Sequence, residues 1–498
     1  MTSLLNSLSP QALLSLQREQ ARRLKERAGK ADYVTPDGIV RFVRDILHAE
    51  PTAYQEDVLR NLVIHKRAAV RGPHGLGKTA MASWVILWGF TAFGDDVKVP
   101  VTASAWRQLT HFTFPEVKKW ALKADWSKVG LNLRYGQEIL EQSLKLPGRE
   151  AFPVASDNPA LIEGAHARTI VYVFDEAKAI QAGTFDAAEG AFSNAGTDTT
   201  AQAFALAIST PGETGGRFYD IHKRRPGYED WWVRHVTLEE AIAAGRVSRE
   251  WAEQRRRQWG ETSPVYINRV LGEFAEAGTD VLIPLSWVEL AIERWHDRGG
   301  VGVGETRYGV DVARYGDDST TIGRLVGSTF EQLDYLAQKN TMETTGEVIF
   351  RLRGDKKILT LVDVIGIGAG VVDRMREQGY NVKGVNAGEG AKDERGKPIT
   401  DDSGELKFIN LRSLIWWMLR ERLDPNGDDP LALPPDDRLT GDLTAPKWRV
   451  TSNGSIQVES KDEIRKRIGR STDSADALGL AVFGARKQEQ VWDKAEFW

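Results

Sequence analysis

The stretch that decides this fold is Gly72-Pro73-His74-Gly75-Leu76-Gly77-Lys78-Thr79, which matches every fixed position of the phosphate-loop pattern G-x-x-x-x-G-K-[ST]. The glycines Gly72, Gly75 and Gly77 let backbone N–H groups close around the phosphates of a nucleotide. Lys78 supplies a positive charge to those phosphates, and the Thr79 hydroxyl can bind Mg²⁺. A strand-like run precedes the loop at 66–71, and an apolar, helix-compatible run follows it at 80–90. The sequence therefore predicts a P-loop domain of the α/β class that binds a nucleoside triphosphate with Mg²⁺.

Composition narrows the class of protein. The chain has 498 residues, enough for two or three domains, and its 27% charged and 41% hydrophobic residues are typical of globular proteins. A net charge of −4 gives no basic field over the whole chain, so any DNA contact must come from local basic patches. The absence of cysteine excludes disulfides and cysteine-bound zinc, and it fits a reducing cytoplasm. No run of about 18 apolar residues is present, so no membrane-spanning helix is expected.

The pattern along the chain predicts five segments. Residues 1–32 read as an N-terminal helical arm, and residues 486–498 read as a polar C-terminal tail. Between them we expect a P-loop ATPase domain at 33–212, a helical linker or subdomain at 213–300 and a second α/β domain at 301–485.

Short apolar runs mark the strands of the two α/β domains. In the first domain they alternate with helical stretches, which indicates a mainly parallel sheet covered by helices. In the second domain three consecutive strands come before strand–helix alternation, which suggests a mixed sheet as in ribonuclease H-like folds. The expected strands are 68–71, 97–102, 169–174 and 204–209, then 306–312, 320–325, 329–335 and 358–364, with helices at 369–378 and 411–422.

Two further motifs complete the expected ATPase site. An apolar run ends in Asp175-Glu176, so Asp175 can hold Mg²⁺ at the end of a buried strand while Glu176 polarises the attacking water as general base. Ser209-Thr210-Pro211 follows another apolar run, and its hydroxyls could sense the γ-phosphate; an ordinary strand-ending turn is the alternative. The strand expected at 97–102 lies between the phosphate loop and Asp175 in the sequence, which fits the ATPase branch in which an extra strand separates the two motifs.

Two other predictions concern the nucleotide. Tyr54 could stack on the adenine and Gln55 could hydrogen-bond to it, although core packing of Tyr54 and a surface position of Gln55 explain them equally well. An arginine finger is expected for phosphoryl transfer, and the sequence does not choose between Arg71, Arg149 and Arg168.

A set of acidic residues predicts a second chemistry in the later domain. Asp311 lies within an apolar strand, Asp363 lies at the end of a second one, and Asp473 and Asp476 share one face of a helix. Together they could converge on two Mg²⁺ or Mn²⁺ ions for phosphodiester cleavage, with Asp311, Asp363 and Asp476 as catalytic ligands. A basic strip suited to DNA phosphates lies nearby, or else forms a solvated helix face: Lys461, Arg465, Lys466, Arg467 and Arg470.

In this order the motifs resemble the large terminase subunit of tailed bacteriophages. The resemblance covers about residues 50–485 and includes three further runs, within 157–166, 266–274 and 408–417. Thr472 stands where such proteins often have proline, which leaves open whether Asp473 or Asp476 is the main third metal ligand.

The resemblance implies a RecA-like (ASCE) P-loop ATPase domain followed by an RNase H-like nuclease domain. It implies a motor that packages double-stranded DNA into a prohead and an endonuclease that cuts concatemeric DNA. The expected partners are DNA, the portal protein and a small terminase subunit, with the chain forming a homo-oligomeric ring on the portal in the host cytoplasm and no membrane contact.

Two other classes of protein remain open. A helicase–nuclease of recombination or repair would share ATP and DNA, but it typically has a second RecA-like domain, which the sequence does not indicate. An ATP-switched DNA-binding assembly module would not need Glu176 as a general base. The complete set of acidic residues favours an enzyme.

Overall fold

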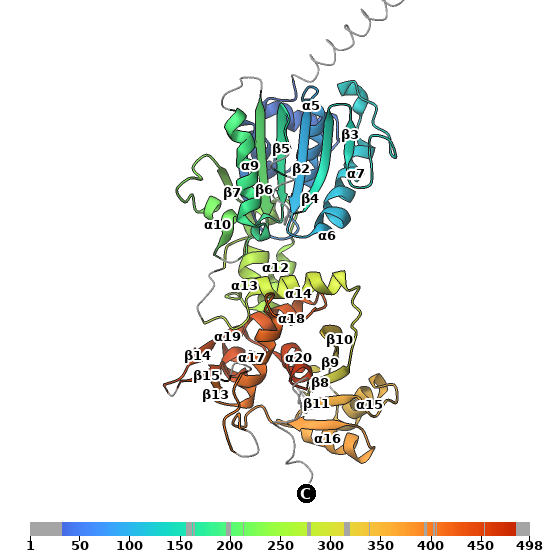
Figure 1. Ribbon diagram of the computed structural model, residues 1–498, viewed down its shortest axis with the longest axis vertical. Coiled ribbons are helices and arrows are strands. Elements are labelled where there is room, and N and C mark those ends of the chain that lie inside the picture. The colour runs from blue at the N-terminus through green and yellow to red at the C-terminus, as the bar shows by residue number, and fades with distance from the viewer. Residues whose placement is uncertain are drawn as a thin grey trace, which may run out of the picture. The chain divides into compact units, whose positions relative to one another are not determined.

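The computed structural model describes residues 32–484, except 156–161, 163–164, 196–200, 213, 276–279, 313–318, 338, 393–395, 402–403, 405 and 453. The chain divides into two compact units, which are described separately (Figure 1). Unit 1 comprises Met1–Arg249 and Asn268–Ala275, and unit 2 comprises Glu250–Ile267 and Glu276–Trp498. The expected tail and all but the last residue of the expected arm lie outside the described residues.

Unit 1 is built on a seven-stranded sheet in the order β3-β4-β2-β5-β6-β1-β7, parallel except for the short hairpin strand β3. The strands are β1 (Arg67–Arg71), β2 (Val97–Ala103), β3 (Leu144–Leu146), β4 (Arg149–Ala155), β5 (Thr169–Asp175), β6 (Gln202–Ser209) and β7 (Trp232–His235). All four strands expected here are confirmed. Every residue of β5 is buried, as expected for a parallel strand covered on both faces.

The strand that separates the phosphate loop from the acidic strand is β6, which pairs with both β1 and β5. The expectation that the strand at 97–102 fits this position is wrong in space, because β2 lies on the other side of β5. Sequence order does not fix strand order in a parallel sheet, where long connections let a later strand enter between earlier ones.

Helices connect and cover these strands. The helices assigned to unit 1 are α3 (Pro36–Asp45), α4 (Ala53–His65), α5 (Lys78–Ala92), α6 (Trp106–Gln108), the π-helix η1 (Leu109–Thr113), α7 (Phe114–Lys123), η2 (Trp126–Val129), η3 (Ala177–Ala179), α9 (Ala182–Ala195), α10 (Gly216–His222) and α11 (Leu238–Ala243). The helix after the phosphate loop, α5, is almost wholly buried, as its apolar sequence predicts. Two helices cross the boundary between the units: α12 (Arg249–Trp259) and the π-helix η4 (Ile267–Leu271).

Unit 2 contains a five-stranded sheet in the order β10-β9-β8-β11-β12. Its strands are β8 (Thr306–Asp311), β9 (Ser319–Val326), β10 (Thr329–Ala337), β11 (Leu359–Asp363) and β12 (Val382–Val385). β9 is antiparallel to both neighbours, whereas β8, β11 and β12 are parallel. This mixed sheet, three meandering strands followed by two that return through helices, confirms the expected ribonuclease H-like fold.

A small second sheet in unit 2 was not expected from the sequence: β13 (Lys407–Phe408), β15 (Ser455–Val458) and β14 (Trp448–Val450). The helices of this unit are α13 (Pro264–Tyr266), α14 (Leu285–Asp297), α15 (Thr341–Arg351), α16 (Gly368–Glu377), α17 (Leu411–Leu423), α18 (Asp437–Thr444), α19 (Lys461–Ile468) and α20 (Asp473–Phe483). The two helices predicted at 369–378 and 411–422 correspond to α16 and α17.

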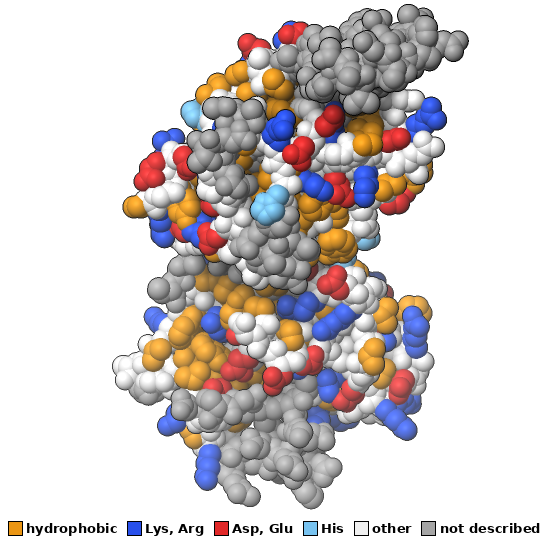
Figure 2. All heavy atoms as spheres, turned by 45° about the horizontal axis from the view of Figure 1, so that its top comes forward, with side chains coloured by type: hydrophobic (Ala, Val, Ile, Leu, Met, Phe, Trp, Pro, Cys, Tyr) orange, Lys and Arg blue, Asp and Glu red, His pale blue; other side chains and the backbone are white. Residues whose placement is uncertain are grey.

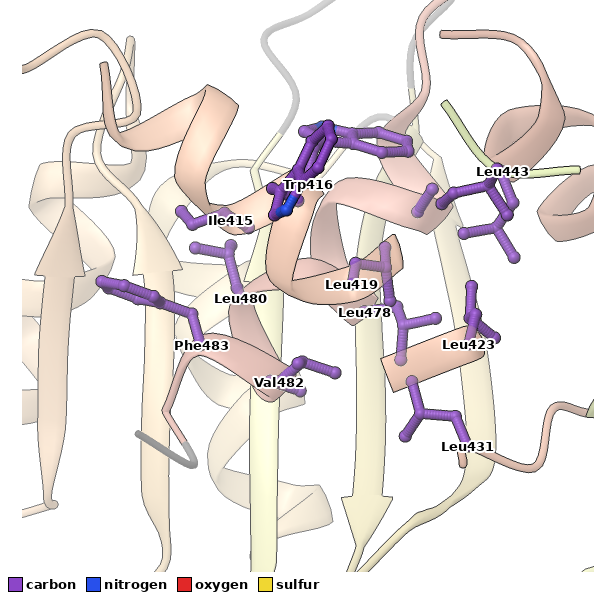
Figure 3. Close-up of a cluster of buried hydrophobic side chains, with 14 of the residues drawn as sticks. Ile415, Trp416, Leu419, Leu423, Leu431, Leu443, Leu478, Leu480, Val482 and Phe483 are labelled. Carbon is purple, nitrogen blue, oxygen red and sulfur yellow. The ribbon is translucent and has the colours of Figure 1, made fainter. Parts of the chain in front are cut away.

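The core of unit 2 centres on α20, every residue of which is buried. The helix packs against β8 and β9 and against α17, whose apolar side chains surround Leu478 and Leu480 (Figure 3). Gly309 of β8 permits this packing, because a Cβ there would lie 1.9 Å from the carbonyl oxygen of Ala477. Glycine at this position brings the helix backbone onto the strand.

The surface agrees with the near-neutral net charge. On the face that Figure 2 shows, lysine and arginine side chains are interspersed with aspartate and glutamate over both units. No helix within the described ranges combines the length and apolar character needed to cross a membrane.

Candidate active sites

The phosphate loop joins β1 to α5 with backbone geometry that suits an anion. Gly75 and Gly77 adopt left-handed conformations with φ of 82° and 79°, which favour glycine. Lys78 opens α5, and its ammonium donates to two loop carbonyl oxygens at 3.3 and 2.7 Å and to Thr210 Oγ1 at 3.2 Å. Thr79 follows in the first turn of α5 and is half-buried. Burial lowers the pKa of Lys78 to about 8, against the opposing effect of the neighbouring acids.

Asp175 ends β5 at the same edge of the sheet as the loop. Its carboxylate is buried and accepts hydrogen bonds from Thr113 Oγ1 at 2.7 Å and Gln108 Nε2 at 3.3 Å, both on Oδ2. Burial, together with the charge of Glu176, raises the pKa of Asp175 to about 6. A buried carboxylate held by two neutral donors is suited to bind a cation.

The Ser-Thr turn connects the acidic strand to the loop. Ser209 Oγ lies within donating distance of Glu176 Oε2 at 3.0 Å and of the Thr210 carbonyl oxygen at 2.6 Å, while Thr210 Oγ1 accepts from Lys78. Glu176 itself has a left-handed backbone with φ of 48°, uncommon for a residue with a side chain. The structure thus brings the expected base, the expected sensor and the loop lysine into one hydrogen-bonded set.

Tyr54 and Gln55 lie beneath the phosphate loop. The Tyr54 hydroxyl donates to the Leu76 carbonyl oxygen at 2.5 Å, and Gln55 Nε2 donates to the Gly77 carbonyl oxygen at 3.3 Å. Gln55 Oε1 also accepts from the backbone N–H of Thr52, which caps α4. In this arrangement both side chains support the loop, and the adenine contact remains a prediction.

The three candidate arginines lie at different edges of the sheet. Arg71 ends β1 near the loop and pairs with Glu273. Arg149 begins β4 and pairs with Asp95, and Arg168 precedes β5; both lie at the edge away from the loop. Of the three, only Arg71 is therefore placed to act on a nucleotide in its own unit.

Residues 268–275 lie against the phosphate loop, a contact that the sequence did not predict. Asn268 Nδ2 donates to the Gly212 carbonyl oxygen at 2.8 Å, just after the Ser-Thr turn, and His74 N donates to the Arg269 carbonyl oxygen at 2.9 Å. A Cβ on Gly272 would lie 2.6 Å from the Cα of Gly72. The segment had no chemical motif of its own; only its similarity to terminase runs marked it.

In unit 2 the first two predicted acids are neighbours. Asp311 ends β8 and Asp363 ends β11, and the parallel register pairs Val310 with Val362 directly before them. Both carboxylates are buried. Burial raises the pKa of Asp311 to about 8, with Lys461 opposing, and also raises the pKa of Asp363.

The two acids of α20 have different surroundings. Asp476 Oδ1 accepts from Arg412 Nη1 at 2.8 Å and Trp416 Nε1 at 2.9 Å, while Oδ2 accepts from Thr472 Oγ1 at 2.9 Å and lies 3.1 Å from Lys461 Nζ. Although burial opposes it, the two cations lower the pKa of Asp476.

Asp473 has fewer donors. Its nearest recorded cation contacts are Arg438 Nη2 at 3.4 Å and Lys461 Nζ at 3.9 Å. Its oxygens are therefore less committed to protein donors than those of Asp476.

The cation at the centre of this cluster is Lys461, the first residue of α19. Its ammonium lies 2.8 Å from Asp311 Oδ2, besides its contacts with Asp476 and Asp473. Burial alone would lower the pKa of Lys461, but these three carboxylates raise it above its ordinary value. The sequence placed this lysine in a basic strip and gave no signal of its position among the acids.

The expected metal ligands are not assembled as a ready-made set. Within the described ranges, no group of three or more His, Asp or Glu side chains is arranged to hold a metal ion. The physical reason is that the ammonium of Lys461 lies between the carboxylates, in the place that a metal ion would take. The residues still fit Mg²⁺ or Mn²⁺, because the cluster offers buried carboxylate oxygens and already accommodates positive charge.

The predicted basic strip is not a continuous surface that is open to DNA. Besides Lys461, Arg467 pairs with Glu459 and Arg470 pairs with Asp442 inside the unit. The expectation of a continuous strip for DNA phosphates is therefore wrong for Arg467 and Arg470, because packing of α19 and the loop before α20 pairs them with acids inside the unit.

The known proteins that resemble this chain are large terminases. No family model matches the chain. It is 24% identical over 262 residues to the probable terminase large subunit of Enterobacteria phage P7, covering 50% of this chain and 51% of that protein. The chain thus spans about half the length of this curated relative.

Solved structures of two large terminases also align with the chain. The large terminase of a thermophilic bacteriophage is 13% identical and covers 92% of this chain and 98% of its own, with a TM-score of 0.38. The nuclease domain of the large terminase subunit of bacterial virus Sf6 is 20% identical and covers 40% and 97%, with a TM-score of 0.35. Scores below 0.5 do not establish a common fold on their own.

The similarity to large terminases rests on the sequence relationship to the phage P7 protein and on the order of the motifs. A phosphate loop, an acidic strand end and a Ser-Thr turn share one sheet edge, and an acidic cluster occupies a ribonuclease H-like unit. By this sequence relationship and this order of motifs, the chain is similar to the large terminase subunits of bacteriophages.

Proposed function

We propose that this chain is an ATP-driven motor that moves double-stranded viral DNA into proheads and cuts concatemeric DNA by metal-dependent hydrolysis. The observation that carries the proposal is the presence of two different sites in one chain. Unit 1 has a P-loop site with its acids and coupling turn, and unit 2 has a buried carboxylate cluster. A nuclease alone would not need the first site, and an ATPase alone would not need the second.

In unit 1 the loop glycines Gly72, Gly75 and Gly77 would surround the phosphates, with Lys78 balancing their charge. Thr79 and Asp175 would hold Mg²⁺, and Glu176 would take a proton from the attacking water as general base. The bond from Ser209 supports this role, because it fixes the orientation of the Glu176 carboxylate.

Thr210 is suited to report the γ-phosphate. Lys78 now donates to its hydroxyl. A phosphate that attracts the same ammonium weakens this bond, so loss of the phosphate after hydrolysis restores it. The turn at 209–211 would thereby transmit the nucleotide state.

In unit 2 we assign Asp311, Asp363 and Asp473 as metal ligands. When bound, the ions would activate water and stabilise the leaving oxygen. We assign Asp476 a structural role in place of the catalytic role that the sequence suggested, because its two oxygens already have four donors. Lys461 would neutralise the acids and offer a cation to the scissile phosphate.

The remaining features of the proposal follow from the resemblance to large terminases: a ring on the portal protein, a small terminase subunit that selects DNA, and action in the host cytoplasm. The form of unit 2 supports packaging over strand separation. Its mixed five-stranded sheet carries acids at strand ends, whereas a typical monomeric helicase has a second P-loop-type sheet.

A packaging assay tests the proposal. Chain, small subunit, cognate proheads and linear DNA are mixed with ATP, and DNA protected from nuclease is measured. We expect protection with wild type, none with Lys78→Ala, and normal protection of pre-cut DNA with Asp363→Ala. ATP hydrolysis without any protected DNA would contradict the motor function.

The same preparation distinguishes an enzyme from an ATP-operated switch. We expect Glu176→Gln to bind ATP normally and to lose at least about a hundredfold in turnover, the usual contribution of a general base. Turnover near the wild-type rate would favour a switch.

A further inference from the structure

One helical run in unit 1 has an inner face on the ATPase site and an outer face that no motif explains. It comprises α6, η1 and α7 without a break, 18 residues from Trp106 to Lys123 (Figure 1). At about 1.5 Å per residue it is roughly 27 Å long, comparable to about eight base pairs of duplex DNA. It begins just beyond the carboxyl end of β2.

The inner face contacts the expected Mg²⁺ ligand. Thr113 Oγ1 and Gln108 Nε2 both donate to Asp175 Oδ2, and Thr113 is buried. These two residues bracket the π-helical turn η1. Single π turns inside α-helices occur frequently at functional sites, because they realign the residues on either side. A change in what Asp175 binds therefore changes the hydrogen bonds that this turn makes.

The outer face combines aromatic rings and cations. Trp106 and Phe112 are 49% and 48% exposed. The Arg107 guanidinium lies over the Phe112 ring at 5.5 Å from its centroid, and Lys119 and Lys123 lie over the Trp120 ring at 5.5 and 5.7 Å. A cation over a ring keeps its charge, so Arg107 and Lys123 can still attract an external anion.

The charge of residues 106–123 indicates which kind of molecule this face binds. Between 106 and 123 the sequence has four lysines and arginines and one acid, Glu116, in a chain whose net charge is −4. Lys118 and Lys119 pair with acids, but Arg107 and Lys123 form no ion pair with any residue that the structure describes. Basic residues with interleaved aromatics along an extended helix suit the phosphates and sugars of DNA.

We propose that residues 106–123 are a contact surface for the backbone of double-stranded DNA, connected to the ATPase site through Gln108 and Thr113. The proposal rests on the proposed packaging function and names the part of unit 1 that holds DNA. Binding of DNA on the outer face and of Mg·ATP at Asp175 then influence each other through one turn of π-helix.

DNA binding tests the surface. The full chain is titrated onto a labelled duplex of random sequence, and fluorescence anisotropy is followed at several salt concentrations. Loss of two phosphate contacts in Arg107→Gln/Lys123→Gln lowers the slope of log K against log salt by about two. The matched control, Arg41→Gln/Lys128→Gln, removes two cations from α3 and η2 and leaves the slope unchanged. An unchanged slope in the first variant overturns the surface.

ATPase measurements with and without duplex test the connection. Thr113→Val keeps the shape of the side chain and removes the donor to Asp175; Thr110→Val is the control within the same turn. We expect Thr113→Val to bind DNA normally while the ratio of rates with and without DNA changes by at least about threefold. If Thr113→Val does not fold, Gln108→Leu takes its place. A ratio equal to that of Thr110→Val overturns the connection.

Failure of this inference is distinct from failure of the proposed function. If wild type binds duplex and hydrolyses ATP but the 107/123 variant behaves like wild type, only the surface is wrong. If wild type hydrolyses ATP and binds no duplex at any salt concentration, the motor function itself is wrong.

Discussion

The two units each place a lysine at the centre of a buried polar site, and the two lysines have opposite surroundings. Lys78 donates to two carbonyl oxygens and a hydroxyl, and burial lowers its pKa to about 8. Lys461 lies among three carboxylates, which raise its pKa. The first site has positive charge without a paired acid and suits an anion; the second has excess negative charge and suits cations. The comparison explains how one chain could keep the proposed nucleotide site and the proposed metal site separate.

The largest expected effect comes from removing the cation of the anion site. Lys78→Ala should reduce ATP turnover by at least about a thousandfold, because a buried cation on the phosphates acts directly on the transition state. Phosphate release measures this effect. The control is Lys145→Ala, an exposed lysine of the same unit. ATP turnover retained in Lys78→Ala would remove the anion-site assignment.

The second prediction separates the two acids of α20. Asp473→Asn should abolish plasmid cleavage with normal thermal stability, because it removes a proposed metal ligand. Asp476→Asn should destabilise unit 2 by about 3 kcal/mol, because it leaves the buried Arg412 without its partner. Thermal melting and plasmid nicking of both variants check this, and the reverse pattern would assign Asp476 as the ligand.

The sequence predicted the features that have a local pattern and did not predict those that depend on residues far apart in the chain. The phosphate loop, the Asp175 strand and the acids at 311 and 363 are local patterns, and the strands that carry them were predicted within a few residues. The position of β6 between β1 and β5 is a property of chain topology and has no local signal.

The same distinction explains the residues that were missed. Lys461 belongs to a charged helix in the sequence, and only the packing of α19 brings its ammonium to Asp311. The choice between Asp473 and Asp476 depends on donors from Arg412 and Trp416, which lie 64 and 60 residues before Asp476. A one-dimensional pattern identifies the acids without identifying their partners.

The third prediction concerns the orientation of the general base. Ser209→Ala removes the donor to Glu176 and should lower ATP turnover by about tenfold with little change in ATP affinity, a fraction of the full general-base contribution. Ser193→Ala, at an exposed serine of α9, is the control. An effect on affinity alone would mean that Ser209 acts on the nucleotide and not on Glu176.

The smallest effect is a pH dependence of ATP binding. Lys78 is charged below its pKa of about 8 and must take up a proton to bind phosphate above it. ATP affinity should therefore be constant below about pH 8 and fall by up to about tenfold per pH unit above it. Calorimetry of wild type and Lys78→Arg checks this, because arginine stays charged throughout. A flat profile in wild type would contradict the lowered pKa.

The central claim, that the chain has two independent sites, is tested most directly by Mn²⁺- and Mg²⁺-dependent cleavage of supercoiled plasmid. Wild type, Lys78→Ala and Asp363→Ala are compared at equal concentration after folding is checked by circular dichroism. We predict that wild type and Lys78→Ala cut the plasmid and that Asp363→Ala does not. Cleavage by Asp363→Ala, or its loss in folded Lys78→Ala, would contradict the account.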